Sequence, residues 1–262
     1  MRERKSAVFG AGASVGLLGG LIGLGGAEFR LPLLIGLFRF QALEAVILNK
    51  AISLVVVIAA LPIRSFSVPF AEVLQWWPSI LNLLAGSLIG AWLGAGWATR
   101  LKSQHLYQII AVLLVSIAAA LFFGHDPQGN GRPLFNGYMQ VLAGLLTGLV
   151  IGVVASLLGV AGGELLIPTF VLLFGADIKL AGSLSLAVSL PTMLIGFARY
   201  SQDQSFSVIG RHKPFLFWMA LGSLAGAALG GLLLGWVASG VLMPLLALIL
   251  VISALKTWRN WS

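Results

Sequence analysis

The stretch GLLGGLIGLGGAEFRLP, from Gly16 to Pro32, returns in altered form as GVVASLLGVAGGELLIP, from Gly152 to Pro168. Six residues keep their places after this shift of 136, since Gly16, Leu21, Gly23, Gly26, Glu28 and Pro32 recur as Gly152, Leu157, Gly159, Gly162, Glu164 and Pro168. The same shift aligns Ala45 to Leu54 with Ala181 to Leu190, and Gly86 to Gly94 with Gly222 to Gly230. One constant shift over three blocks predicts an internal duplication, and the shared acid and proline make the match specific.

The composition is that of a membrane protein. Of the 262 residues, 59% are hydrophobic and 9% are charged, and the mean hydropathy is +1.01. Soluble domains carry about 25% charged residues. Several apolar runs reach the roughly 20 residues that a membrane helix needs, for example residues 137–160. The runs are continuous, whereas strands of a membrane barrel alternate. We therefore predict an all-α polytopic membrane protein.

The net charge of +8 does not indicate nucleic-acid binding, because lysines and arginines gather at the ends of apolar runs. The N-terminal sequence MRERKSAVFGAGASVG is similar to a secretory signal. Its apolar run continues past any plausible cleavage site, so we expect it to be retained. The chain has no cysteine and therefore no disulfide framework.

The pattern divides the chain into a first repeat at 1–124, a linker loop at 125–136 and a second repeat at 137–262. Each repeat begins with a long glycine-rich helix and a short apolar piece, at about 29–40 and 165–176. Three longer helices follow, at about 43–62, 72–98 and 105–124, and at 180–198, 213–236 and 240–257. This layout predicts 8–10 membrane segments with two broken or short helices. Glycine ladders such as Gly86, Gly90 and Gly94 predict close helix packing.

Basic residues change sides between the halves. The loop near residue 64 has Arg64 alone, whereas its equivalent has Arg199, Arg211 and Lys213. The N-terminus is basic, whereas its equivalent, the central linker, carries Arg132 alone. The loop near 101 is also basic, whereas its equivalent near 237 carries no basic residue. The positive-inside rule then favours two oppositely inserted repeats, as in many secondary transporters. Four crossings per half in parallel orientation remain the alternative. Both arrangements place the N- and C-termini in the cytoplasm.

The helix breaks are the first candidate site. Gly25, Gly26 and then Pro32 in the first half, and Gly162, Gly163 and Pro168 in the second, are expected to interrupt helices within the apolar layer. Irregular backbone at membrane depth is tolerated where protein buries it or water reaches it. The N–H groups of a helix that starts there, at Ala27 or Gly163, attract anions. A packing kink without a ligand is the alternative.

Glu28 and Glu164 are duplicated acids just after the breaks. An acid in the first turn of a helix can simply cap it. The alternative is proton carriage, because a low-dielectric site favours the neutral carboxyl. Arg30 has no counterpart, since Leu166 takes its place. Two positions from Glu28 on a helix, Arg30 is not expected to face that acid.

Further candidates for substrate binding follow in the next helix of each repeat. Lys50 needs an acidic partner or an anionic ligand unless it snorkels to a surface, and its equivalent is Leu186. A duplicated polar stripe, which either lines a path or joins helices, consists of Asn49 and Ser53 in the first half and of Ser183, Ser185 and Ser189 in the second. The sequence has no nucleophile–base constellation, no phosphate-binding loop and no metal-ligand spacing, so neither an enzyme nor a cofactor or metal is expected.

The glycine-rich blocks GLIGLGGAEFRLPLL and GLVIGVVASLLGVAGGELLIPTFVLLFGADIKLAGSLSLAVSLP, in about 260 apolar residues, resemble the TauE/SafE family. These are sulfite-exporter-like and sulfonate uptake permeases. The resemblance covers essentially the whole chain and is more specific in the second half. It departs from the family pattern at Asn49 and Lys50, where small hydroxyl residues are more usual. It implies transport of sulfite, sulfonates or other small anions across the bacterial inner membrane.

We therefore predict a secondary transporter of a small, sulfur-containing anion, driven by an ion gradient and working by alternating access at a site near the middle of the membrane. The alternatives are an anion channel and a permease for a non-sulfur organic anion. An intramembrane enzyme or assembly factor is disfavoured, because no catalytic constellation is present. The expected partners are the anion and membrane lipid, without nucleic acid; whether the chain forms a homodimer stays open.

Overall fold

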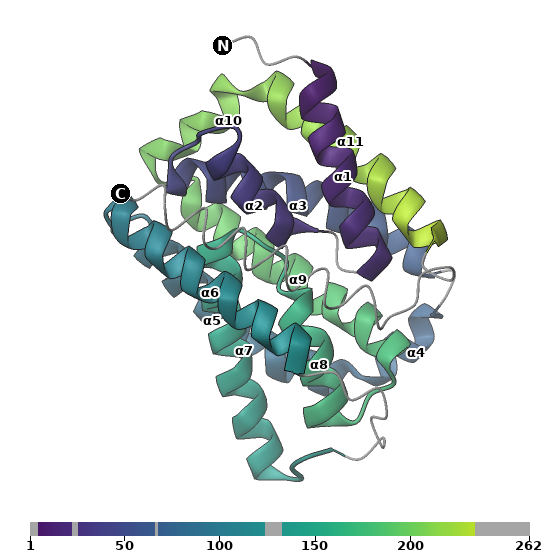
Figure 1. Ribbon diagram of the computed structural model, residues 1–262. Coiled ribbons are helices and arrows are strands. Elements are labelled where there is room, and N and C mark those ends of the chain that lie inside the picture. The colour runs from purple at the N-terminus through teal and green to yellow at the C-terminus, as the bar shows by residue number, and fades with distance from the viewer. Residues whose placement is uncertain (1–4, 23–25, 66–67, 124–132, 234–262) are drawn as a thin grey trace.

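The computed structural model describes residues 5–22, 26–65, 68–123 and 133–233, and every element in these ranges is helical (Figure 1). The elements are α1 (Lys5–Ile22), α2 (Ala27–Gly36), α3 (Ala42–Ser65), α4 (Phe70–Gln75), α5 (Trp77–Ala98), α6 (Ser103–Phe123), α7 (Tyr138–Leu158), α8 (Gly163–Phe174), α9 (Ile178–Tyr200), the 3₁₀ turn η1 (Gln204–Phe206), α10 (Ser207–Arg211) and α11 (Lys213–Leu233). The all-helical prediction is confirmed for this part of the chain.

The predicted helices match the observed ones with one correction. The short pieces are α2 and α8, each beginning two residues earlier than expected. The single helix expected over 72–98 is wrong, because the backbone leaves helical geometry at Trp76, with φ −93° and ψ 14°. Pro78, which lacks an N–H group, lies in the first turn of α5, where that group would have no intrahelical partner. The helix expected at 240–257 lies outside the described residues.

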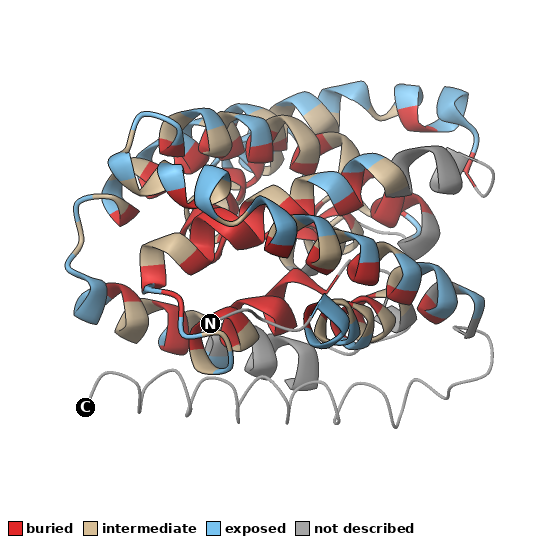
Figure 2. Cartoon of the chain, turned by 90° about the horizontal axis from the view of Figure 1, so that it is seen from above, coloured by how far each residue is buried: buried red, intermediate tan, exposed pale blue. Residues whose placement is uncertain are grey.

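Four described helices are long and apolar enough to cross a membrane. They are Ala42–Ala59, Trp77–Ala98, Tyr138–Leu158 and Leu180–Tyr200. Large apolar side chains such as Leu93, Leu146 and Val150 are exposed on them, and Figure 2 shows the buried residues gathered on the facing sides of the helices. An apolar outer surface on a helical bundle matches a lipid environment.

Two helix pairs pack by the same contacts. Gly86 and Gly90 of α5 lie against the carbonyl groups of Leu145 and Leu149 in α7. After the shift of 136, Gly222 and Gly226 of α11 lie against the carbonyl groups of Phe9 and Ala13 in α1. A Cβ at any of these four glycines would collide with backbone. The prediction that glycine ladders permit close packing is therefore confirmed at these positions.

The contacts also fix helix directions. Along α5, Ser87 meets Thr192 and Gly96 meets Arg199, so α5 and α9 run parallel. Gly86 meets Leu145 and Gly94 meets Val153, so α5 and α7 also run parallel. In α3 the order is reversed, because Lys50 lies at Gly196 of α9 whereas the later residue Val57 clusters with the earlier residue Met193. Helix α3 therefore runs opposite to α7, and opposite to α9, its counterpart in the sequence repeat.

Candidate functional site

Glycines in the left-handed backbone region make the helix breaks. Gly26 precedes α2 with φ 71°, Gly162 precedes α8 with φ 80°, and Gly159 ends α7 with φ 66°. Other residues adopt these angles only under strain. Pro32 and Pro168 lie inside α2 and α8, so the expectation that the prolines help interrupt the helices is wrong. Each removes one backbone hydrogen bond while the helix continues, as membrane helices tolerate.

Asn49 of α3 joins the two breaks. Its Nδ2 donates to the carbonyl of Ala27, the first residue of α2, at 3.0 Å. The same nitrogen donates to the carbonyl of Leu158, the last residue of α7, also at 3.0 Å. Asn49 is fully buried. The start of one broken helix and the end of the other therefore meet across a single side-chain amide.

Arg30 lies beside this junction. Its Nη1 donates to Asn49 Oδ1 at 3.3 Å and to Ser53 Oγ at 3.1 Å, and the residue has no exposed surface. Its charge is also attracted by that of Glu28, which is 2% exposed. Arg30 lies near the positive end of the α2 dipole. Sequence reasoning left it out of the site, although a lone cation in an apolar stretch was a signal for it.

Lys50, the next residue of α3 after Asn49, contacts α7 and α9. Its Nζ donates to the carbonyl of Ala155 at 3.5 Å and lies 6.0 Å from the centre of the Tyr200 ring. The lysine has no exposed surface, so it does not snorkel. Tyr200 donates to the carbonyl of Ser156 at 2.8 Å. Lys50, Tyr200 and Asn49 thus bind three carbonyl groups in the last turn of α7, the end of a helix that favours positive charge.

The second-half serines are buried but bonded differently. Ser185 donates to the carbonyl of Gly182 in its own helix at 2.8 Å. Within the described residues, the hydroxyls of Ser183 and Ser189 have no hydrogen-bond partner. The repeat explains why Ser189 has no partner. In the first half its counterpart Ser53 accepts a hydrogen bond from Arg30, whereas in the second half Leu166 replaces that arginine.

Ser223 of α11 is a second hydroxyl whose partner in the other half has been replaced by an apolar residue. Ser87 of α5 shares a 2.7 Å hydrogen bond with Thr192, whereas its counterpart Ser223 has no partner in the described part of the chain. Val56 stands where the repeat would place a threonine. The polar contacts therefore concentrate in the first half, around α2 and α3. Gly25 and the side chain of Glu164 lie outside the described residues.

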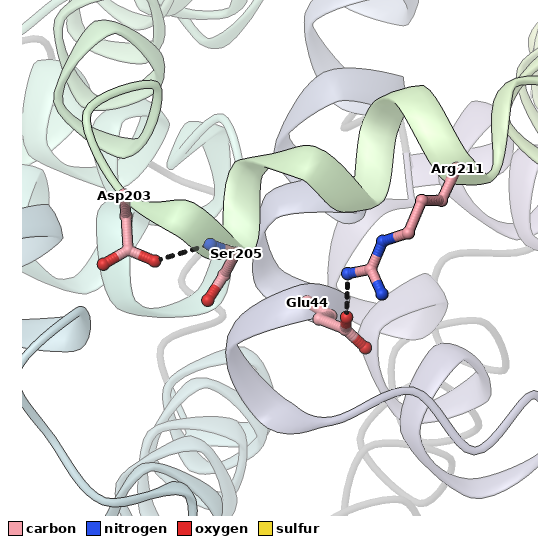
Figure 3. A network of polar contacts seen from close by, with 4 residues as sticks. All are labelled: Glu44, Asp203, Ser205 and Arg211. Carbon is pink, nitrogen blue, oxygen red and sulfur yellow. Dashed lines mark hydrogen bonds and ion pairs between the residues drawn. The ribbon is translucent and has the colours of Figure 1, made fainter.

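A separate polar contact lies at the end of the bundle where α3 begins. Arg211 Nη2 of α10 and Glu44 Oε1 form an ion pair at 2.7 Å (Figure 3). Nearby, Asp203 accepts a hydrogen bond from the backbone N–H of Ser205 at 2.8 Å. The Arg211 side chain is 56% exposed, so this contact does not belong to the buried site.

Membrane-length apolar helices, packed around two breaks that share buried charges, define a multi-pass membrane protein of helical type. Residues 144–262 match the family described as sulfite exporter TauE/SafE. No curated protein and no solved structure matches the chain.

Proposed function

We propose that the protein is a secondary transporter of a small anion, with sulfite or an organosulfonate as the substrate class. The observation that carries this proposal is the fully buried guanidinium of Arg30, placed at the first turn of α2 and hydrogen-bonded to neutral Asn49 and Ser53. Buried cations in membrane helices are costly and mark ligand or ion pathways. The name of the matched family supports the sulfur-containing class.

The balance of charge supports an anion. Arg30 and Lys50 bring two cations to the junction, and Glu28 brings one acid. The N–H groups at the start of α2 add positive potential. An arriving anion therefore meets a positive site in a low-dielectric layer. Gly26, Ala27, Asn49, Lys50 and Ser53 line it from the first half; the neutral groups at Gly162, Gly163, Ser183, Ser185 and Ser189 belong to the opposing half.

Glu28 balances part of this charge. A neutral Glu28 would no longer attract the Arg30 guanidinium, and an anion could take over that attraction, so proton and anion movement would be coupled. Glu164 is the corresponding proton-carrying candidate in the second half. Transport that does not depend on a proton gradient, and that is unchanged in Glu28→Gln and Glu164→Gln, would remove this part of the proposal.

The two repeats are inserted in opposite orientations in this proposal. The opposite directions of α3 and α9 support it. Cysteines introduced at exposed Glu72 and Gln202 provide the test, since the chain has no cysteine of its own. Labelling from opposite sides of the membrane is expected, with Gln202→Cys on the cytoplasmic side. Labelling of both from one side would refute inversion.

Anion binding tests the main proposal. The purified protein is heated with sulfite, thiosulfate, sulfoacetate, taurine or acetate, and its melting temperature is followed. A ligand at 100 times its Kd stabilises the folded state by about 2.7 kcal/mol. We expect sulfur oxyanions to raise the melting temperature most. Stabilisation by carboxylates alone would shift the substrate class, and stabilisation by none would overturn the proposal. Saturable uptake in vesicles, without single-channel currents, separates a transporter from a channel.

A further inference from the structure

Gly196 of α9 faces the end of the Lys50 side chain. A Cβ at this position would lie 2.8 Å from Cε and 2.9 Å from Nζ of Lys50, and 3.0 Å from Oγ of Ser156. Gly196 is not among the glycines with positive φ and lies within the regular helix α9. Space, and not backbone freedom, is therefore what a glycine supplies here. The ammonium group lies against the bare backbone of α9.

Tyr200, one helical turn later in α9, packs beside the same ammonium group; we call Gly196 and Tyr200 together the α9 wall. It is fully buried, and its hydroxyl is fixed by the 2.8 Å hydrogen bond to the carbonyl of Ser156. The ring centre lies 6.0 Å from Lys50 Nζ, at the outer limit of a cation–π contact. Ser156 in turn donates to the carbonyl of Ala91 at 3.0 Å. One side of the ammonium is thus enclosed by two residues of α9 and held against α7.

The repeat shows that the residues of the α9 wall differ in the half that has no lysine. In the sequence, the counterparts of Lys50, Gly196 and Tyr200 are Leu186, Ala60 and Arg64. Glycine therefore stands opposite lysine, and alanine takes its place where the lysine is replaced by leucine. The ammonium has three donors, and its one hydrogen bond within the described residues is the long contact to Ala155. The other two donors have no hydrogen-bond partner within the described residues.

We propose that Gly196 and Tyr200 are positioning residues that aim the Lys50 ammonium at the anion. The inference rests on the proposed function, because the anion is the ligand that the two remaining donors would bind. A side chain at Gly196 displaces the ammonium and weakens anion binding. Removal of the Tyr200 hydroxyl loosens the same wall without adding volume.

Sulfite binding to the purified full-length protein tests the proposal. We expect Gly196→Ala to raise the Kd for sulfite about tenfold, and Tyr200→Phe to raise it about threefold, because a charge-assisted contact is sensitive to displacement. Gly10→Ala is the matched control, since a Cβ at Gly10 of α1 has nothing within 4 Å. Its Kd should equal that of the wild type. Wild-type Kd values in both Gly196→Ala and Tyr200→Phe would overturn the proposal.

A double-mutant cycle separates positioning from general packing. If Gly196 acts through Lys50, Gly196→Ala lowers the melting temperature of the wild type but not that of Lys50→Ala. An equal loss in both backgrounds would make Gly196 a packing residue only and contradict the proposal. The cycle needs no anion. Failure of the wild type to bind any anion would therefore overturn the proposed function, while the cycle still reports whether Gly196 acts on Lys50.

Discussion

Replacing Asn49 by alanine is expected to destabilise the protein strongly. The substitution removes the two hydrogen bonds that join α2 to α7, through the carbonyls of Ala27 and Leu158. It also removes the oxygen that accepts a hydrogen bond from Arg30. None of the three groups can turn to water, because the junction is buried.

The magnitude follows from the kinds of bond. Hydrogen bonds between membrane helices contribute about 0.6 kcal/mol each. A hydrogen bond to a charged group contributes about 1.5–3 kcal/mol. Asn49→Ala removes two hydrogen bonds between helices and one from a charged group, so its free energy of unfolding should fall by about 3 kcal/mol. Its counterpart Ser185 bonds only within its own helix, so Ser185→Ala should lose less than about 1 kcal/mol.

Equilibrium unfolding of the purified protein in mixed micelles measures both values. The midpoint of Asn49→Ala should fall well below that of Ser185→Ala at an equal slope of the transition. Equal midpoints for the two variants, or a loss below about 1 kcal/mol for Asn49→Ala, would refute the claim that this amide holds the two breaks together.

Three further predictions use the repeat and the surface. Ser53→Ala should lower the free energy of unfolding by about 1.5–3 kcal/mol because it breaks the hydrogen bond to Arg30, whereas Ser189→Ala should be neutral or stabilising. Unfolding midpoints measure both, and a larger loss of stability for Ser189→Ala would contradict this prediction. Gly226→Ala should lower the free energy of unfolding by about 1–3 kcal/mol because it pushes α11 away from α1, and Gly10→Ala should leave stability unchanged. Equal melting temperatures for the two variants would disprove the close-packing argument. Arg211→Ala, which removes the exposed ion pair of Figure 3, should change stability by less than about 1 kcal/mol at any salt concentration, and a larger loss would mean that this pair fixes the end of the bundle.

The sequence was sufficient for the short helices because their cause is local. Gly26 and Gly162 adopt left-handed backbone, and each directly precedes a short helix. The starts of α2 and α8 were placed two residues late, since the boundary depends on which glycine takes the left-handed angle. The split at Trp76 was missed because the residues on both sides of it are apolar and continue the pattern.

The site could be predicted only in part, because its contacts join distant segments. Asn49 and Leu158 are 109 residues apart, and no local pattern in the sequence pairs them. The duplication pointed to Asn49 and Ser53 as a polar stripe, yet it also set Arg30 aside because that residue does not recur. Two residues that differ between the halves, Arg30 and Lys50, carry the buried positive charge. Gly196 and Tyr200 of α9 carry no signal in the sequence, since their role depends on the lysine that packs against them.

Uptake of radiolabelled sulfite into proteoliposomes tests the central claim, that Arg30 is the cation of a transport site. Arg30→Gln is compared with Arg39→Gln, which removes an exposed arginine from the loop between α2 and α3. The wild type and Arg39→Gln should show saturable uptake with the same KM. Arg30→Gln should raise the KM at least about tenfold, the equivalent of 1.4 kcal/mol. Saturable uptake by Arg30→Gln with the wild-type KM would contradict the account.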